Sequence, residues 1–487
     1  MYGVIEPPSR RWRGGVMGSS SQRPGQPRWL AWALCAAALA ATAAPSGATD
    51  LIDAWRAAQQ HDLDYTAARA AQQAGAARRS QASALWRPTV LLSGAAGLAG
   101  NDTGVTGAQF SAPGFGVSEG VAFNTSVNRG AMGRLALSAS LPLFSREREV
   151  QGRQLLLSAD VADLEWQEAQ QTLMLDTAQR YFDVGLAGQS LRVLHQQQAA
   201  VDRALIEAQD RFRLGDVPVT DTHEAAARAQ AIAAQRLVLE TDLQLKEAEF
   251  ADATGLQPAA LQPMLPAPEA TPIEAQELAF WLTEAAAGNP LLRRQLAAVE
   301  VARQEAAKSS SARSPNVNLI AQLGRERLSG SGDFGSASNS AGNRMIGVQI
   351  SVPLYTGGMR SALQQEALRG IDKAQAQADR TRQLVAQKTR AAWLGLTVGA
   401  GRVAALSQAL AASRMRLDAT RLGRQVGDRT TLDLLNAEND AASAELTLLQ
   451  ARIELSMNRL RLAAVAGQLD EARLQLINAS LRLPDER

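Results

Sequence analysis

Two very long proline-free stretches constrain the fold of this 487-residue chain more than any other feature. Ser145–Arg213 has 69 residues and Gly357–Val426 has 70. In the first, apolar residues recur at helical spacing, as in Val201, Leu205 and Phe212. A 69-residue helix is about 104 Å long, and a helix of that length needs packing partners along its whole course. The stretches therefore predict a coiled-coil-like helical bundle.

Shorter helical segments flank each long one. In each half their lengths nearly add up to that of the long helix, so two short helices could stack end to end beside it. Pro218 suits the first turn of one of them, because proline is favoured there. The predicted short helices span Asp50–Arg87, Pro218–Thr254, Thr283–Ser314 and Thr430–Ala466.

The chain repeats its own pattern on either side of a proline cluster, Pro258–Pro272, which we interpret as a linker. Gly215-Asp216 returns as Gly427-Asp428, at an offset of 212 residues. Leu141-Pro142-Leu143-Phe144 is matched by Val352-Pro353-Leu354-Tyr355. This order indicates an internal duplication. We predict one repeat over residues 49–271 and a second over residues 272–487.

Four segments between the helices alternate apolar and polar residues, which is the pattern of strands with one apolar face. Ile346, Val348 and Ile350, for example, alternate with Gly347 and Gln349. Their length matches that of membrane-barrel strands, about 9–11 residues. We predict strands at about residues 88–100, 131–143, 315–326 and 343–355, joined in pairs by two Gly/Ser/Asn-rich loops, Gly100–Gly130 and Arg327–Asn343.

Four strands are too few to close a membrane barrel, since known barrels have at least about eight. An open sheet edge is excluded in lipid, because unpaired backbone groups are costly there. Either the strands lie outside a membrane or several chains build one barrel. No nearby segment covers the Ile346/Val348/Ile350 face, which favours the shared barrel over a soluble sheet.

The first 48 residues have the layout of a secretory signal peptide. A basic region is followed by the apolar run Trp29–Ala41, too short to span a bilayer, and by small residues such as Ala41-Thr42-Ala43. Translation could start at Met1 or Met17, and a membrane anchor or disordered tail is the alternative. Leu34 precedes Cys35, which does not fit a lipidation site. Removal of the segment takes away five Arg and one Glu, so the formal charge changes from +2 to −2.

Charge and composition exclude several functions. The 50 Lys and Arg balance 48 Asp and Glu, whereas a nucleic-acid-binding protein carries a basic face. Cys35 is the only cysteine, and His61, His195 and His223 share no helical spacing, so we expect no disulfide framework, metal site or cofactor. Nothing in the sequence indicates an enzyme.

The ordered, duplicated series of elements resembles the TolC-type outer-membrane efflux and secretion proteins. The residues that carry the resemblance are Asp50-Leu51-Ile52-Asp53-Ala54-Trp55-Arg56, Ala287-Gly288-Asn289-Pro290-Leu291, Trp86-Arg87-Pro88, Arg313-Ser314-Pro315, Pro142 and Pro353. The resemblance implies a mostly helical homotrimer with a twelve-stranded barrel, a helical tunnel and a belt built from Pro258–Pro272 and the C-terminal segment. It also implies outer-membrane lipid as surroundings, a Gram-negative bacterium, a periplasmic adaptor, and an inner-membrane ABC transporter or proton-driven pump.

The resemblance also implies a gate where each half turns between long and short helices, at Gly215 and Gly427. Arg429 would tie to Thr220 and Asp221, and Asp433, repeated threefold, would form an acidic ring that favours cations. Two positions depart from the family pattern: Asn436 replaces a second ring Asp, and Arg424 replaces a Tyr that supports the closed state. Ordinary helix capping is the alternative role for Arg429, Asp433 and Asp221.

Three aromatic residues at strand ends, Trp86, Phe144 and Tyr355, fit an interfacial belt, with local packing as the alternative. The sequence predicts an outer-membrane channel subunit for type I secretion, of a toxin- or haemolysin-like protein, because a lipidation site is missing at Cys35. A multidrug efflux channel is the alternative, and a non-channel periplasmic coiled-coil adaptor is a third reading.

Overall fold

The computed structural model describes residues 50–114, 116–257, 263–267, 276–311, 314–333 and 335–482. The predicted signal peptide, Arg313 and most of the proline cluster Pro258–Pro272 lie outside these residues. Two long helices carry the rest of the fold, as the proline-free stretches predicted: α4 (Arg146–Leu214, 69 residues) and α8 (Met359–Gln425, 67 residues). Each turns back into a shorter helix, α5 (Val219–Thr254) or α9 (Thr431–Val465).

The predicted helices Asp50–Arg87 and Thr283–Ser314 are each split in two, which sequence reasoning missed. The first becomes α2 (Leu51–His61) and α3 (Leu63–Ala84), and the second becomes α6 (Leu278–Gly288) and α7 (Pro290–Ser311). Asp62 and Asn289 sit at the breaks in an extended conformation. Their side chains cap the next helix, Asp62 accepting from the Tyr65 amide at 2.7 Å and Asn289 from the Leu292 amide at 2.9 Å.

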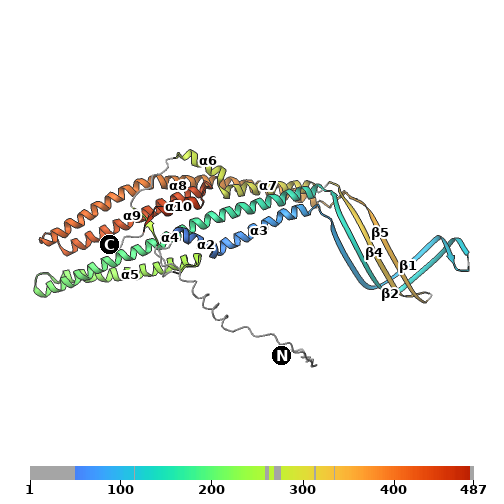
Figure 1. Ribbon diagram of the computed structural model, residues 1–487, viewed down its shortest axis with the longest axis horizontal. Helices are drawn as coiled ribbons and strands as arrows, with labels where there is room; N and C mark the ends of the chain where they lie inside the picture. Colours follow the sequence, from blue (N-terminus) through green and yellow to red (C-terminus); the bar gives the residue numbers. More distant parts are fainter. Residues whose placement is uncertain are drawn as a thin grey trace, which may run out of the picture. The chain divides into compact units, whose positions relative to one another are not determined.

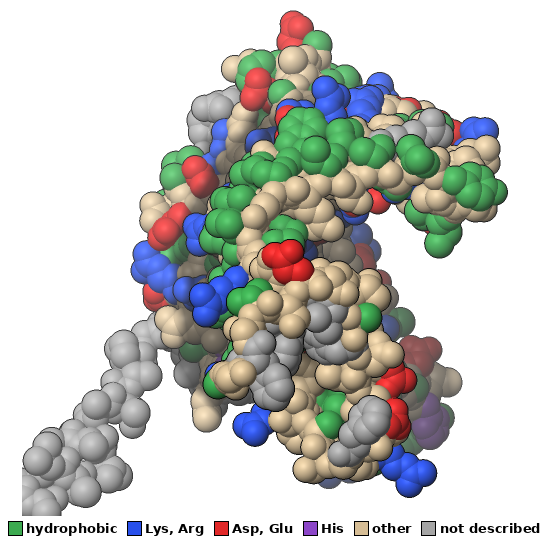
Figure 2. All heavy atoms as spheres, turned by 90° about the vertical axis from the view of Figure 1, so that its right-hand side faces the viewer, with side chains coloured by type: hydrophobic (Ala, Val, Ile, Leu, Met, Phe, Trp, Pro, Cys, Tyr) green, Lys and Arg blue, Asp and Glu red, His purple; other side chains and the backbone are tan. Residues whose placement is uncertain are grey.

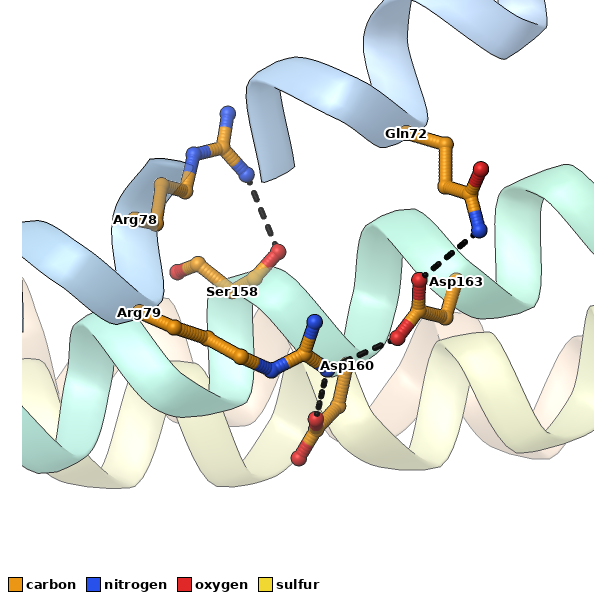
Figure 3. A network of polar contacts seen from close by, with 6 residues as sticks. All are labelled: Gln72, Arg78, Arg79, Ser158, Asp160 and Asp163. Carbon is orange, nitrogen blue, oxygen red and sulfur yellow. Dashed lines mark hydrogen bonds and ion pairs between the residues drawn. The ribbon is translucent and has the colours of Figure 1, made fainter. Parts of the chain in front are cut away.

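The short helices stack along the long ones, as predicted (Figure 1). α3 packs on the first part of α4, where Gly75 lies so close to Ala162 that a Cβ would come within 2.4 Å of the Ala162 Cβ. Polar contacts reinforce this pair: Arg79 donates to Asp160 at 2.9 Å and to Asp163 at 2.7 Å, and Gln72 also reaches Asp163 (Figure 3). α7 packs between α4 and α8 and joins the two halves.

A four-stranded antiparallel sheet continues from the ends of α3, α4, α7 and α8 that lie opposite the helical turns (Figure 1). Its order is β1 (Thr89–Ala112), β2 (Gly116–Phe144), β4 (Asn316–Gly332) and β5 (Gly335–Ser351). Four strands are present where they were predicted, although the last ends at Ser351 and not at residue 355, and the two predicted loops are wrong. Strand pairing continues through the Gly/Ser/Asn-rich segments to Ala112↔Gly116 and Gly332↔Gly335. The backbone amides and carbonyls of the two paired segments hydrogen-bond to each other, so these segments extend the strands.

Register sorts the sheet into an apolar and a polar face. Val317, Leu319 and Leu323 share one face with their partners across the sheet, Leu141, Leu137, Val348 and Ile350. Most large side chains of this apolar face are exposed in a single chain, Ile346 by 77%. Figure 2, which views the sheet end, shows hydrophobic side chains gathered in a curved band. β1 and β5 each have a neighbour on one side only.

The main core lies where α2, α4, α5, α9 and α10 (Glu471–Ala479) meet. Tyr181, Phe182 and Phe250 are fully buried there. The Tyr181 hydroxyl accepts a hydrogen bond from the Met264 amide at 2.8 Å, and burial raises the pKa of this hydroxyl. Next to Met264, β3 (Leu265–Pro266) pairs with β6 (Leu481–Arg482), so part of the proline cluster and the C-terminal segment do meet, as the expected belt requires.

Candidate functional site

The two helical turns have the same geometry, residue for residue. Gly215 and Gly427 both have φ of 83°, a left-handed conformation that favours glycine. The Asp216 amide donates to the Arg211 carbonyl at 2.9 Å, and the Asp428 amide donates to the Gly423 carbonyl at 2.8 Å. The duplicated sequence therefore builds two equivalent hairpin tips, α4–α5 and α8–α9.

Asp433 is held at the start of α9 by Thr430. Its Oδ2 accepts from the Thr430 amide at 3.0 Å and from the Thr430 hydroxyl at 2.9 Å, while its own amide donates back to that hydroxyl at 3.1 Å. These hydrogen bonds, with a smaller contribution from Arg429, lower the pKa of the Asp433 carboxyl. Oδ2 of Asp433 therefore serves as a helix cap, as the capping alternative predicted. Oδ1 has no hydrogen-bond partner in the described residues.

The remaining predicted gate residues do not meet within one chain. Arg429 is exposed, and its side chain lies over Gly423, where a Cβ would be 2.8 Å from the Arg429 Cγ. Arg429 makes no hydrogen bond or ion pair with another described residue. Thr220 donates only to its neighbour Asp221, at 3.4 Å. The predicted link from Arg429 to Thr220 and Asp221 is therefore not made within one chain.

Arg424 instead forms an ion pair that sequence reasoning missed. Its guanidinium donates to the carboxylate of Glu207 on α4, with side-chain exposures of 26% and 43%. The pair joins the α8–α9 hairpin to the α4–α5 hairpin. Other α8 arginines pair within their own hairpin, with acids of α9: Arg402–Glu454, Arg414–Glu445, Arg416–Asp440 and Arg421–Glu438. Arg424 is the member of this series that reaches across.

An apolar contact supports the same junction between the hairpins. Leu435 of α9 is buried in a cluster with Val201 of α4 and Ile232 of α5. One residue on, Asn436 is exposed, with no hydrogen bond in the described part of the chain. The Gln197 amide lies 3.5 Å from the Asn439 side-chain oxygen beside this cluster. The α9 start is therefore anchored through Leu435 while Asn436 stays open to solvent.

Both tips expose large apolar side chains, which sequence reasoning also missed. Such side chains usually mark a contact with another molecule when they gather in one place. They are Phe212, Leu214, Val219, Leu422, Val426 and Leu432. Their position at the turns, where no other described element covers them, makes the tips a candidate docking surface.

The three aromatic residues lie at the opposite end, where the sheet joins the helices. Trp86 follows α3, Phe144 ends β2 and Tyr355 precedes α8, and all three are exposed. Tyr355 is 88% exposed, whereas Trp86 and Phe144 are 39% and 45% exposed, so the interfacial belt stays a prediction. Elsewhere in the described residues, no group of three or more His, Cys, Asp or Glu side chains is arranged to hold a metal ion.

Known proteins share this arrangement. The sequence profile of the outer membrane efflux protein family matches residues 55–256 and 281–480. The outer membrane protein TolC of Salmonella enteritidis is 28% identical over 331 residues, 67% of each chain. The alkaline protease secretion protein AprF of Pseudomonas aeruginosa is 28% identical over 346 residues, 71% of each chain. The crystal structure of the Campylobacter jejuni CmeC outer membrane channel has a TM-score of 0.68 at 14% identity, covering 89% of this chain and 90% of that one.

The two family matches follow one another along the chain and together include both long helices and all four strands of the sheet. The chain belongs to the outer membrane efflux protein family.

Proposed function

We propose that this outer-membrane protein of a Gram-negative bacterium is the exit duct of a type I secretion machine, with three copies forming one twelve-stranded barrel and one periplasmic tunnel. The four-stranded sheet carries the proposal: it has an exposed apolar face and two edges without neighbours. Because lipid does not tolerate open edges, three sheets joined edge to edge satisfy both features. Family members are channels of efflux and secretion systems, and such a duct moves its substrate without chemistry of its own.

The proposed cargo is a polypeptide of the toxin or haemolysin kind. The relative AprF is named as a protease secretion protein, which supports this branch. Leu34 before Cys35 does not fit a lipidation site, whereas many drug-efflux channels carry a lipid anchor, so the sequence favours the secretion branch. Efflux of small molecules is the second candidate, because the matching family is named for outer-membrane efflux proteins.

Deletion of the gene separates the two candidates. We expect the deletion strain to lose at least one secreted polypeptide, detected by mass spectrometry of the culture supernatant, while its sensitivity to drugs and detergents stays unchanged. Expression of the full chain should restore secretion. Drug hypersensitivity with an unchanged set of secreted proteins would assign the duct to efflux instead.

Exposed apolar surface supports the proposed partners. By length and composition alone, α8 is the one described helix that could cross a membrane, yet only 11% of its most apolar window is buried. A neighbouring copy packed along α8 would cover this surface and close the tunnel. The apolar tips would meet a periplasmic adaptor, which links the duct to an inner-membrane ABC transporter or proton-driven pump.

The proposed gate combines links within and between copies. Arg424–Glu207 holds the two hairpins of one chain together, and Arg429 is free to reach Thr220 and Asp221 of a neighbouring copy, whose oxygens suit a guanidinium. Asp433 supplies one carboxylate per chain to an acidic ring through its open Oδ1. Asn436 adds no charge, so the ring carries three negative charges in the trimer.

Cation preference of the reconstituted channel should depend on Asp433. Within one chain, the hydrogen bonds from Thr430 lower the pKa of Asp433 and so favour its charged form, while repulsion between the three carboxylates of a ring would oppose this; the preference should be lost as acid protonates the ring. Asp433→Asn should reduce cation selectivity at pH 7, Asn436→Asp should increase it, and Thr430→Ala should move the acid-induced loss to higher pH. Reversal potentials in a salt gradient measure each effect; an unchanged potential in Asp433→Asn would mean that the residue only caps α9.

A further inference from the structure

Arginines accumulate on the apolar face of the sheet, at the border farthest from the helices. Arg325 and Arg327 lie on β4, and register places them on the same face as Val317 and Leu323. Arg344 pairs with Leu323, and Arg129 pairs with Ser331, on the same face. All four side chains are exposed, and none makes an ion pair or hydrogen bond with another described residue. The face therefore carries an unpaired row of positive charge.

Among the described residues, no carboxylate lies next to Arg325 and Arg327 on this face; Asp102 of β1, beyond the register shift at Ala99, is the nearest acid on it. Glu326 lies between Arg325 and Arg327, so it belongs to the opposite face, where its cross-strand neighbour is Arg134. Asp333, in the turn after β4, is engaged by Ser126 at 2.9 Å and by Asn128 at 2.6 Å. Arg325 and Arg327 therefore have no carboxylate partner among the described residues of their own chain, and they are open to an anion from outside it.

The depth of the row matches the far border of a membrane. Strands rise about 3.4 Å per residue and tilt by about 40° in membrane barrels, so Arg325 and Arg327 lie about 21 Å and about 26 Å along the barrel axis from Val317. The apolar band of such barrels is about 25 Å tall. Arginine at the middle of the lipid is costly, whereas at the border its head reaches the lipid phosphates.

A hollow in the sheet surface adjoins the two central arginines. Its volume is about 830 Å³, and its lining includes Gly94, Ala96 and Gly133 together with Arg325 and Arg327. All five share the arginine-bearing face by register. Because glycine and alanine leave the backbone uncovered, the hollow offers an acyl chain or a sugar ring a place beside the two guanidinium groups. A guanidinium fork binds phosphate oxygens in pairs.

We propose that Arg325 and Arg327 bind the phosphate groups of an outer-leaflet glycolipid, whose body rests in the hollow over Gly94, Ala96 and Gly133. This inference rests on the proposed barrel, because the barrel turns the apolar face to lipid and its far border to the outer leaflet. Arg129 and Arg344 extend the anion-binding row on either side. The site anchors the barrel to the phosphorylated lipid that surrounds it.

Lipid retained by the purified trimer tests the site. Trimers extracted from outer membranes in mild detergent are washed, and bisphosphorylated lipid A is quantified per trimer by mass spectrometry. Arg325→Gln/Arg327→Gln should retain about tenfold less, because the charge-assisted hydrogen bonds to the phosphates are lost while binding through the acyl chains persists. Arg69→Gln/Arg87→Gln removes the same charge from exposed positions outside α8 and outside the sheet, and should retain the wild-type amount.

A second variant tests the hollow without changing charge. A Cβ at Gly133 meets no atom within 4 Å, so a side chain can start there, and Gly133→Phe, which places a ring in the hollow, should also lower lipid retention severalfold. Dephosphorylated lipid A should bind to wild type as weakly as intact lipid A binds to the double arginine variant. Inorganic phosphate alone should not displace the lipid; displacement at millimolar concentration would identify a simple phosphate site and overturn the proposal.

The outcomes separate this inference from the proposed function. Conductance in planar bilayers is recorded for every variant before the lipid assay. If wild type conducts but retains no more phosphorylated lipid than Arg325→Gln/Arg327→Gln, the lipid site is wrong and the channel stands. If the wild-type protein forms no conducting trimer, the proposed function as a channel is wrong, whatever the lipid assay shows.

Discussion

Replacing Arg424 by alanine should raise the open probability of the closed channel about a hundredfold. The pair with Glu207 is half-buried and joins the two hairpins of each chain. A pair of this exposure is worth about 1 kcal/mol. Three copies around the ring therefore contribute about 3 kcal/mol to closure, and 1.4 kcal/mol corresponds to a factor of ten. Single-channel recording with the periplasmic end facing the voltage-clamped chamber measures the change.

Arg414 offers a matched control for this prediction. Its ion pair with Glu445 lies within the α8–α9 hairpin, so Arg414→Ala removes an arginine and an ion pair without separating the hairpins. Its open probability should stay at the wild-type level. The charge swap Glu207→Arg/Arg424→Glu should restore closure. Equal effects of Arg414→Ala and Arg424→Ala would show that loss of charge, and not the link between hairpins, opens the channel.

The helices were predictable because their signals are local. Absence of proline over Ser145–Arg213 and the repeated Gly-Asp turn are readable without any knowledge of contacts, and α4 begins and ends within one residue of the prediction. The break at Asp62 has no strong local signal, since aspartate is compatible with a helix interior and acts as a cap only once its backbone leaves the helical region. The break at Asn289 does have one, because Pro290 disfavours the helical conformation of the residue before it, and the prediction of one helix over Thr283–Ser314 overlooked it. Helix existence follows from pattern, whereas helix interruption depends on a single backbone conformation.

The errors in the sheet and the gate have a different origin. Gly/Ser/Asn composition in Gly100–Gly130 favours loops, but hairpin partners supply the hydrogen bonds that composition cannot predict. Glu207 and Arg424 are 217 residues apart in sequence, so no spacing rule connects them. Glu207 and Arg424 meet because each lies close to the turn of its own hairpin and the two hairpins lie side by side. The resemblance singled out Asp433 as a gate residue, but only the structure shows that its carboxylate accepts hydrogen bonds from Thr430.

Ile346→Arg should abolish accumulation of the stable trimer in the outer membrane. Ile346 pairs with Ala321, midway between Val317 and Arg325 on β4, and its side chain is 77% exposed in one chain. If the apolar face meets lipid, an arginine at this depth costs about 2–4 kcal/mol per chain, and three copies cost about 6–12 kcal/mol per trimer. That sum is comparable with the whole stability of an ordinary domain, about 5–15 kcal/mol.

Met345 provides the control, because it is the next residue on β5 and points to the opposite face. Met345→Arg introduces the same charge beside Gln322, on the face that the barrel turns to its water-filled interior, and should leave trimer yield and heat resistance unchanged. Heat-resistant trimer in isolated outer membranes, followed by semi-native electrophoresis, reports both variants. Equal tolerance of the two arginines would show that lipid does not contact the Ile346 face. Arg129, Arg325 and Arg327 lie toward the far border of this face and Arg344 lies level with Leu323, whereas no arginine stands level with Ile346, Val348 or Ala321.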